Sequence, residues 1–282
     1  MEIKAMGKSI RIAREKIGLT QEELADGICS VVSLSRIENG NAGVSYSTFQ
    51  ALMSRMGVKL NVSSSFINEL DFECFYTLKK IRYLIHMWRY EEAYEELEKV
   101  ETYDFANNKL YYQEWLILYS YLFQENDMYK YQLLHLAFDI TRKNIDIFHL
   151  ERYYLSYHEM EILILLGNEY LYNKELEKCC VLCKQIETYL DTMSFEMYHK
   201  YTLRAQYEIL YTKYLLSVKK YKKAYENIEK ARQKAVESHC DTPTHELTFL
   251  TGIACYFCGD NESALKYIKI ALYSYASMKS CQ

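Results

Sequence analysis

Apolar positions at helical spacing divide the chain into short helices near its start and a long series of helices behind them. Within residues 19–40 the apolar side chains fall where two short helices would face each other, at Leu24, Ala25, Ile28, Leu34 and Ile37. A break at residues 27–30 turns the first of these helices across the second. The pattern predicts a helix-turn-helix.

Both short helices carry start signals. Thr20 is followed three residues later by Glu23, the spacing of a capping box, in which the hydroxyl and the carboxylate each accept a hydrogen bond from a free backbone N–H group. Ser30 can cap the second helix, and Asn39 and Gly40 tolerate the positive φ at which a chain leaves a helix. These signals agree with the boundaries that the apolar pattern predicts.

Two further helices are expected to flank this pair. One runs over about residues 3–17 and turns Ile10, Ala13 and Ile17 inward. The other is capped by Ser47 and ends at Gly57, and its inward residues are Phe49, Leu52, Met53 and Met56.

From about residue 66 the chain alternates between helical segments and short breaks. One helical pattern recurs three times, with a small residue followed four and seven positions later by further apolar residues: Ala93, Leu97 and Val100; Ala224, Ile228 and Ala231; Ala264, Ile268 and Ala271. The small residue lets a preceding helix pack closely. Gly252 stands twelve residues before Ala264, as a repeat of about 34 residues requires.

Breaks at five sites divide this region into five helix pairs, at Trp88-Arg89, Asn126-Asp127, Gly167-Asn168, Val218-Lys219 and Gly259-Asp260. Stacked helix pairs bury each apolar face against the next pair and form a curved solenoid, whose first helices line a concave surface. The last helix, residues 262–277, is expected to cap the array.

Composition supports an all-α protein of two domains. The 282 residues include one proline and nine glycines, and half of them are apolar, which favours long helices and short turns. The net charge of −4 is uneven, because residues 1–62 hold eight Lys and Arg against six Asp and Glu, and the remainder holds 26 against 32. A domain so weakly basic is expected to need placed phosphate contacts and a second copy in a dimer to bind nucleic acid.

No apolar run approaches the ~18 residues that span a bilayer, and the start lacks a signal-peptide pattern. We therefore expect a cytoplasmic protein with no membrane partner, whose nine cysteines are reduced and mostly buried. Cys179, Cys180 and Cys183 cluster, and Cys255 and Cys258 form a Cys-x-x-Cys pair, yet both groups lie in helical repeats without the turns of a zinc site. Core cysteines are the expectation, and a metal or redox site is the alternative.

The sequence carries no catalytic motif. Its seven histidines show no His-Glu-x-x-His spacing, and it has no phosphate-binding glycine loop and no Gly-x-Ser-x-Gly. The acidic pairs Glu91-Glu92 and Glu95-Glu96 are typical of a solvated helix face. We expect no enzyme activity and no cofactor. Most of the 29 tyrosines are expected to pack helices together, and some to line a groove for an extended peptide.

Two motifs of the predicted helix-turn-helix, Gly-Leu-Thr-Gln-Glu-Glu-Leu-Ala and Ser-Arg-Ile-Glu-Asn-Gly, resemble the signature of the Cro/C1-type, or XRE, repressor domains. This resemblance implies a lambda-repressor-like fold in which Arg14 and Glu38 form an ion pair, the alternative being two surface charges. The turn at residues 27–30 is one residue shorter than usual and resembles the PlcR and Rgg branch. We expect the DNA-binding domain at residues 1–62, a linker or connecting helix at 63–71 and the repeats at 72–282.

In a helix-turn-helix the second helix lies in the major groove of DNA. The exposed candidates on that helix are Ser30, Val31, Val32, Ser33 and Ser35, with Arg36 facing the bases or the backbone. The valines cannot form hydrogen bonds but can contact thymine methyl groups, so we expect an AT-rich site with weak readout from Ser33. The resemblance implies phosphate contacts from Thr20 and Gln21. The alternative is a domain that only dimerises or has lost DNA binding.

A helix-turn-helix followed by tetratricopeptide-like pairs resembles the Rgg/PlcR group of peptide-sensing regulators, the RRNPP family of Gram-positive bacteria. The resemblance implies a homodimer that binds double-stranded DNA at paired half-sites and takes up a short signalling peptide on the concave face of its repeats, in quorum sensing. The repeat register assigns Gln206, Lys213, Phe249 and Tyr256 to that peptide groove.

Two other functions are open at this point. In one, a helix-turn-helix repressor uses its repeats to bind a protein partner instead of a peptide. In the other, the chain is a Rap-type repeat adaptor that acts on a signalling protein. Such adaptors lack the helix-turn-helix that the first forty residues predict, which counts against this second alternative.

Overall fold

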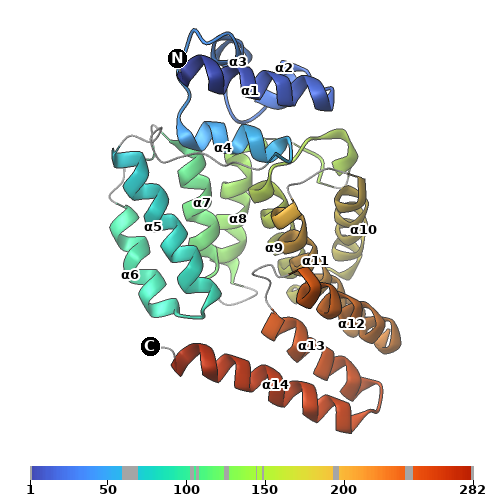
Figure 1. The fold of residues 1–282 in the computed structure, drawn as a ribbon. Coiled ribbons are helices and arrows are strands. Elements are labelled where there is room, and N and C mark those ends of the chain that lie inside the picture. Colours follow the sequence, from blue (N-terminus) through green and yellow to red (C-terminus); the bar gives the residue numbers. More distant parts are fainter. Residues whose placement is uncertain are drawn as a thin grey trace. The chain divides into compact units, whose positions relative to one another are not determined.

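The computed structural model describes residues 2–58, 69–101, 105, 108–123, 127–143, 145–147, 149–192, 197–238 and 244–280. Within those ranges every regular element is a helix, as the sequence predicts (Figure 1). The chain divides into two compact units, Met1–Ile162 with Met193–Glu196, and Leu163–Thr192 with Met197–Gln282. The boundary falls inside a single helix, α9 (Tyr157–Tyr172).

Four helices at the start of the first unit form what we name the head: α1 Glu2–Ile17, α2 Gln21–Ala25, α3 Val31–Glu38 and α4 Tyr46–Arg55. Apolar residues from all four helices make one core, in which Ile10, Leu24, Leu34 and Leu52 have no exposed surface. The predicted helix-turn-helix is confirmed as α2 and α3.

Two details of the head differ from the prediction. Ile17 is expected inside but is 41% exposed, because α1 ends there and Leu19 fills the core instead. The cap of α4 is Ser45, whose hydroxyl accepts a hydrogen bond from the Thr48 backbone N–H, whereas Ser47 lies buried within the helix. The predicted inward residues of this helix are all buried: Phe49, Leu52, Met53 and Met56.

Two helix pairs follow in the first unit. They are α5 Glu69–His86 with α6 Tyr90–Glu101, and α7 Lys109–Ser120 with α8 Met128–Thr141, and behind them come a 3-10 turn, η3 Leu150–Arg152, and the start of α9. Figure 1 shows the four long helices side by side. Trp88, at φ 60°, lies in the predicted break between α5 and α6. Residues 63–68 of the predicted linker lie outside the described residues, and residues 69–71 belong to α5.

The second unit holds the rest of α9 and five more helices: α10 Leu176–Thr192, α11 Met197–Ser217, α12 Tyr221–Ser238, α13 Thr244–Phe257 and α14 Asn261–Ser280. Among the described residues, the ten helices from α5 to α14 follow one another as the five predicted pairs. Lys219 at φ 59° and Gly259 at φ 87° lie at two of the predicted breaks.

One break is predicted in the wrong place. The sequence suggests a helix end at Gly167, but α9 continues to Tyr172 and the turn lies at Lys174, at φ 62°. Gly167 serves packing instead, because a Cβ atom there would lie 2.5 Å from Cδ2 of Leu210 on α11. A glycine inside a helical pattern can mark the close approach of a neighbouring helix as well as a helix end.

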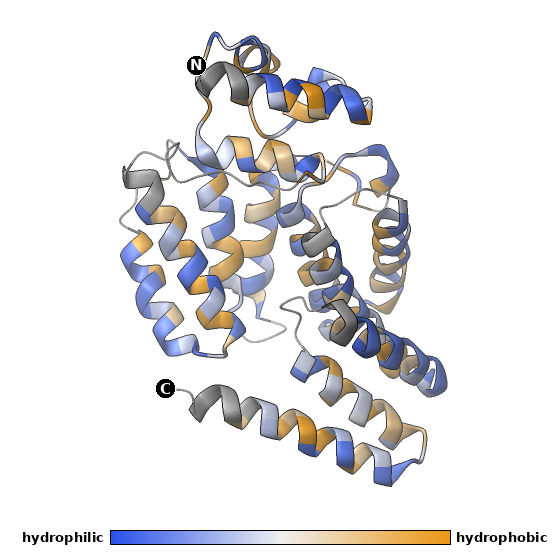
Figure 2. Cartoon of the chain, in the orientation of Figure 1, coloured by the Kyte–Doolittle hydropathy of each residue, from blue (hydrophilic) through white to orange (hydrophobic). Residues whose placement is uncertain are grey.

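The recurrent helical pattern marks buried positions. Eight of its nine residues are buried: Ala93, Leu97, Val100, Ala224, Ile228, Ala231, Ala264 and Ala271. Ile268 is half-buried and lies where a Cβ atom on Gly252 would meet it, at 2.7 Å. Figure 2 shows the resulting alternation of apolar and polar residues along the helices. No helix in the described ranges is long and apolar enough to cross a membrane.

Candidate nucleic-acid interface

The start of α2 carries the predicted capping box. The Thr20 hydroxyl accepts a hydrogen bond from the Glu23 backbone N–H at 3.1 Å, and the Glu23 carboxylate accepts one from the Thr20 backbone N–H at 2.7 Å. Because α2 has only five residues, too few to be stable alone, these two bonds help to fix where it begins. Thr20 itself stays exposed.

The start of α3 is fixed by Ser30. Its hydroxyl accepts a hydrogen bond from the Ser33 backbone N–H at 3.0 Å and lies 2.8 Å from the Ser33 hydroxyl. A cap of this kind stabilises a helix by about 1 kcal/mol. The Ser33 hydroxyl is therefore already hydrogen-bonded at the start of α3.

Three side chains tie the helices of the head together. Arg14 donates from Nε to Oε1 of Glu38 at 2.7 Å and from Nη2 to Oε2 at 2.9 Å. Gln21 donates from Nε2 to the same Oε2 at 2.7 Å. The Glu38 side chain is 1% exposed, so Arg14 and Glu38 form an interior pair rather than two surface charges. The pair joins α1 to α3 and, through Gln21, to α2.

The hydrogen bonds from Arg14 and Gln21 favour the charged form of Glu38. Burial would raise the pKa of Glu38, but the hydrogen bonds from Arg14 and Gln21 outweigh it and lower the pKa of this carboxyl. One of the two amide N–H groups of Gln21 donates to Glu38 inside the head, and the sequence alone does not reveal this bond. Its second N–H remains for an acceptor such as a phosphate oxygen.

The residues predicted to face DNA lie on the outer side of α3. Val32 is 70% exposed and Val31 is 39% exposed. Ser33 and Arg36 are also exposed, and Ser35 is half-buried. The first turn of α3 thus presents methyl groups beside hydroxyl groups, a surface suited to apolar contact with thymine methyls and poor in hydrogen-bond donors.

The head carries less positive charge on its surface than its composition suggests. Arg14 and Arg55 pair with carboxylates inside the first unit, and Glu22 and Glu23 are exposed on α2. Arg36 is the exposed cation of α3. Attraction to phosphate therefore depends on a few placed groups rather than on a broad positive surface.

The four residues predicted for a peptide groove lie on α11 and α13 in the second unit. Lys213 Nζ pairs with Glu246 Oε1 at 3.0 Å and so joins the two helices. Phe249 is 41% exposed and Tyr256 is 61% exposed. The side-chain oxygen of Gln206 is buried and accepts no hydrogen bond from the described residues.

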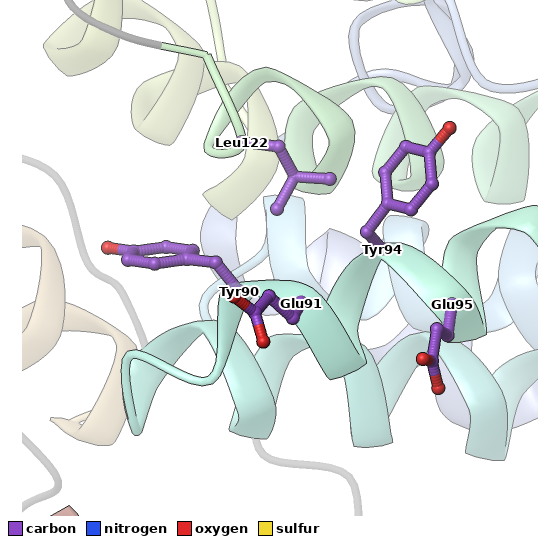
Figure 3. A pocket seen from close by; sticks show the side chains of 5 residues that line it. All are labelled: Tyr90, Glu91, Tyr94, Glu95 and Leu122. Atoms are coloured by element: carbon purple, nitrogen blue, oxygen red, sulfur yellow. The ribbon is translucent and has the colours of Figure 1, made fainter.

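A hollow of about 520 Å³ opens on α6 in the first unit. Its lining is Tyr90, Glu91, Tyr94, Glu95 and Leu122. Figure 3 shows the two tyrosine side chains rising from α6 on either side of Leu122. None of the residues predicted for DNA or peptide binding lines this hollow.

The described cysteines are all free thiols. Cys179, Cys183 and Cys255 are buried, as expected, and Cys180 is half-buried. Cys258 is exposed because it follows the last residue of α13 in a turn. Across the described part of the chain, no three His, Cys, Asp or Glu side chains gather in a way that could hold a metal ion.

Comparison with known proteins identifies the head. Residues 10–62 match the helix-turn-helix family HTH_3, whereas a search of curated protein sequences finds no match to the chain. In fold the chain is similar to PlcR from Bacillus thuringiensis, solved in complex with the peptide PapR7 and DNA, with a TM-score of 0.56 and 18% identity over 99% of this chain and 98% of PlcR.

Two further solved structures are similar to the chain. ComR from Streptococcus suis has a TM-score of 0.47 and 17% identity, over 99% of this chain and 91% of ComR. A PrgX mutant has a TM-score of 0.42 and 13% identity, over 93% of this chain and 99% of PrgX. The chain therefore carries an HTH_3 helix-turn-helix domain at its amino end, followed by a helical-repeat region, in a fold similar to that of PlcR.

Proposed function

We propose that this chain is a sequence-specific DNA-binding transcription regulator, which works in the cytoplasm as a homodimer under the control of a short signalling peptide. Residues 1–62 bind DNA, residues 63–71 connect, and residues 72–282 bind the peptide and form the dimer. The observation that carries the proposal is the outer face of α3, where Val31, Val32 and Ser33 stand exposed on a helix fixed by Ser30 and by the Arg14 to Glu38 pair.

The operator that this face fits is rich in thymine. Val31 and Val32 contact thymine methyl groups in the major groove, and Ser33 adds a weak hydrogen bond. Thr20 and Gln21, at the start of α2, position the head on phosphates. One head offers few cations, so two copies on paired half-sites supply the affinity that one lacks.

The repeat region is proposed to sense the peptide. PlcR, whose fold is similar, was solved with a peptide and DNA bound. On α13, Phe249 and Tyr256 offer exposed rings to the side chains of an extended peptide. On α11, Gln206 has a buried side-chain oxygen and Lys213 pairs with Glu246, so a peptide reaches these two polar groups when it displaces their present neighbours. A peptide that binds one arrangement of the two repeat regions better than another shifts the dimer toward it, and so changes operator affinity.

Selection of bound sequences from a random DNA pool tests the DNA-binding face. The purified chain is expected to enrich paired thymine-rich half-sites, and Val32→Arg should lose or change that preference. Val181→Arg is a matched control, because Val181 is 43% exposed on α10 in the second unit. An unchanged preference in Val32→Arg would sink the assignment of α3 as the reading helix.

Short hydrophobic peptides encoded beside the gene test the sensor. An active peptide is expected to raise the melting temperature of the chain and to change its affinity for DNA. Replacing both Phe249 and Tyr256 by alanine should abolish both effects, whereas Tyr273→Ala, at a 72% exposed residue of α14, should not. If no such peptide changes stability, dimerisation or affinity, the peptide part of the proposal fails and the DNA-binding part stands.

A further inference from the structure

Four charged side chains join the head to the first repeats within the first unit. Arg55, at the end of α4, donates from Nη2 to both carboxylate oxygens of Glu159 in α9, at 2.9 and 3.2 Å. Arg142, directly after α8, donates from Nε to Oε1 of Glu159 at 3.0 Å and from Nη1 to the carboxylate of Asp26, between α2 and α3. The side chains of Arg55, Arg142 and Glu159 are at most 3% exposed.

The same region holds the backbone of the α2–α3 turn. Arg55 donates to the carbonyl oxygens of Leu24, at 3.2 Å, and of Asp26. Lys109, the first residue of α7, donates from Nζ to the carbonyl oxygen of Gly27 at 2.6 Å. The turn that sets the angle between α2 and α3 is thus held by hydrogen bonds from Arg55 of α4 and from Lys109 of the first repeats.

At Gly27 the backbone of the α2–α3 turn lies against the backbone at the end of α8. Gly27 has φ +69°, and a Cβ atom there would lie 1.8 Å from the carbonyl oxygen of Thr141, the last residue of α8. Leu110 and Tyr154, which lie outside the head, pack against its core. Figure 1 shows α4 lying across the ends of α7 and α8. The contact therefore combines close backbone packing, apolar packing and buried charge.

Buried charges define a geometry sharply. Each of the three buried groups is stable only while it keeps its partner, since an unpaired buried ion is costly. A head that tilted or slid would separate Arg55 and Arg142 from Glu159. The network therefore allows one position of the head and opposes small departures from it.

We propose that Asp26, Gly27, Arg55, Arg142 and Glu159 form a docking clamp, which fixes the direction in which the head presents α3. The clamp leaves the DNA-facing side open, since Val32 is 70% exposed while the clamp is closed. It is a positioning device and not a cover over the recognition helix. The regulatory part rests on the proposed function: Glu159 lies in the first-unit part of α9, so a bound peptide that displaces Glu159 from Arg55 and Arg142 would open the clamp.

Two glycine substitutions separate docking from local strain. Gly27 and Gly18 both have positive φ, at +69° and +83°, but a Cβ atom on Gly18 would meet nothing within 4 Å. Alanine at either position brings similar backbone strain, about 1–2 kcal/mol, and only Gly27→Ala also forces the head away from α8. Hydrogen exchange of the full-length chain without DNA should show amides at the end of α8 and the start of α9 exchanging about tenfold faster in Gly27→Ala but not in Gly18→Ala.

A milder variant guards against failure to fold. Asp26→Asn removes the ionic link from an exposed residue, whose side chain is 62% exposed, and keeps the buried pair of Arg55 with Glu159. It should move exchange in the same direction by less. Equal exchange in Gly27→Ala, Asp26→Asn, Gly18→Ala and the unaltered chain would overturn the clamp.

Binding to paired half-sites with varied spacing tests the positioning role. The unaltered chain and Gly18→Ala should prefer one spacing, while Gly27→Ala should bind several spacings within a few-fold of one another, each affinity being compared with the affinity of the same variant for a single half-site. A spacing preference that survives faster exchange would overturn the positioning role. If the unaltered chain binds no DNA, the proposed function fails, and hydrogen exchange still decides whether the clamp exists.

Discussion

How much a charged residue contributes to the stability of the head depends on how deeply its side chain is buried. The Glu38 side chain is 1% exposed and the Arg14 side chain 11%, whereas Arg11 and Glu15, which pair at a similar distance, are 53% and 52% exposed. An exposed pair is screened by water and salt, while a buried carboxylate that loses its partner stays in an unfavourable environment. The two pairs should therefore respond very differently to substitution.

We expect Arg14→Met to destabilise the head by about 3 kcal/mol, because it leaves Glu38 with Gln21 as its hydrogen-bond donor in place of a full charge. Arg11→Met, the matched control, should change stability little. Urea unfolding of both variants measures the difference. Equal stability of the two would mean that the Arg14 to Glu38 pair does not hold the head together.

Glu159 gives a prediction in pH. Burial would raise the pKa of Glu159, but the charges of Arg55 and Arg142 outweigh it and lower the pKa to about 2. In the unfolded chain the pKa of this carboxyl returns to about 4.5. The unfolded state therefore binds a proton more readily, and protonation favours unfolding. The stability that this carboxylate contributes is complete above pH 4.5 and is lost as the pH falls toward about 2.

Chemical unfolding at a series of pH values measures this contribution. Glu159→Gln should be less stable than the unaltered chain at neutral pH and should lose less stability between pH 4.5 and about 2. Glu151→Gln, at an exposed residue of η3, should keep the original pH dependence. Parallel curves for Glu159→Gln and the unaltered chain would contradict the paired, buried state of Glu159.

At the scale of helices, local signals predict boundaries and distant contacts explain the errors. The capping box at Thr20 lies wholly within four residues, and it predicts the start of α2 correctly. Gly167 is different, because the reason for it is Leu210 on another helix. Arg55 is a polar residue on the inward side of α4, which hints at a buried partner, but that partner lies 104 positions away. One sequence does not show such pairings.

Gly167→Ala should destabilise the second unit by about 1–3 kcal/mol, since the added methyl group meets Leu210 Cδ2 at 2.5 Å. In Gly43→Ala the methyl group meets nothing within 4 Å, so that variant should be neutral or slightly more stable. Thermal unfolding measures both variants. Adding Leu210→Ala to Gly167→Ala should cost less than the two single effects combined, and full additivity would show that the methyl group and Leu210 do not collide.

At the scale of the whole molecule, a weakly basic segment, residues 1–62, which contains the head, is joined to an acidic one, residues 63–282, which we name the body. The chain carries a net charge of −4, although residues 1–62 hold two more basic than acidic residues. The body repels the DNA backbone, so non-specific binding is weakened and specific binding relies on contacts that the head places. In the proposed dimer, two heads on paired half-sites double those contacts without adding positive charge to either copy.

The salt dependence of binding follows from this charge distribution. Each phosphate contact adds about 0.9 to the slope of log affinity against log salt concentration. Arg36 is the exposed cation of α3. The substitution Arg36→Gln should therefore lower the slope by about 0.9 for each bound head, which is about twice that value for a dimer. Lys266→Gln, at an exposed residue of α14, should leave the slope unchanged. A change in sequence preference with an unchanged slope would instead place Arg36 on a base, and the size of the slope change reports how many heads the operator holds.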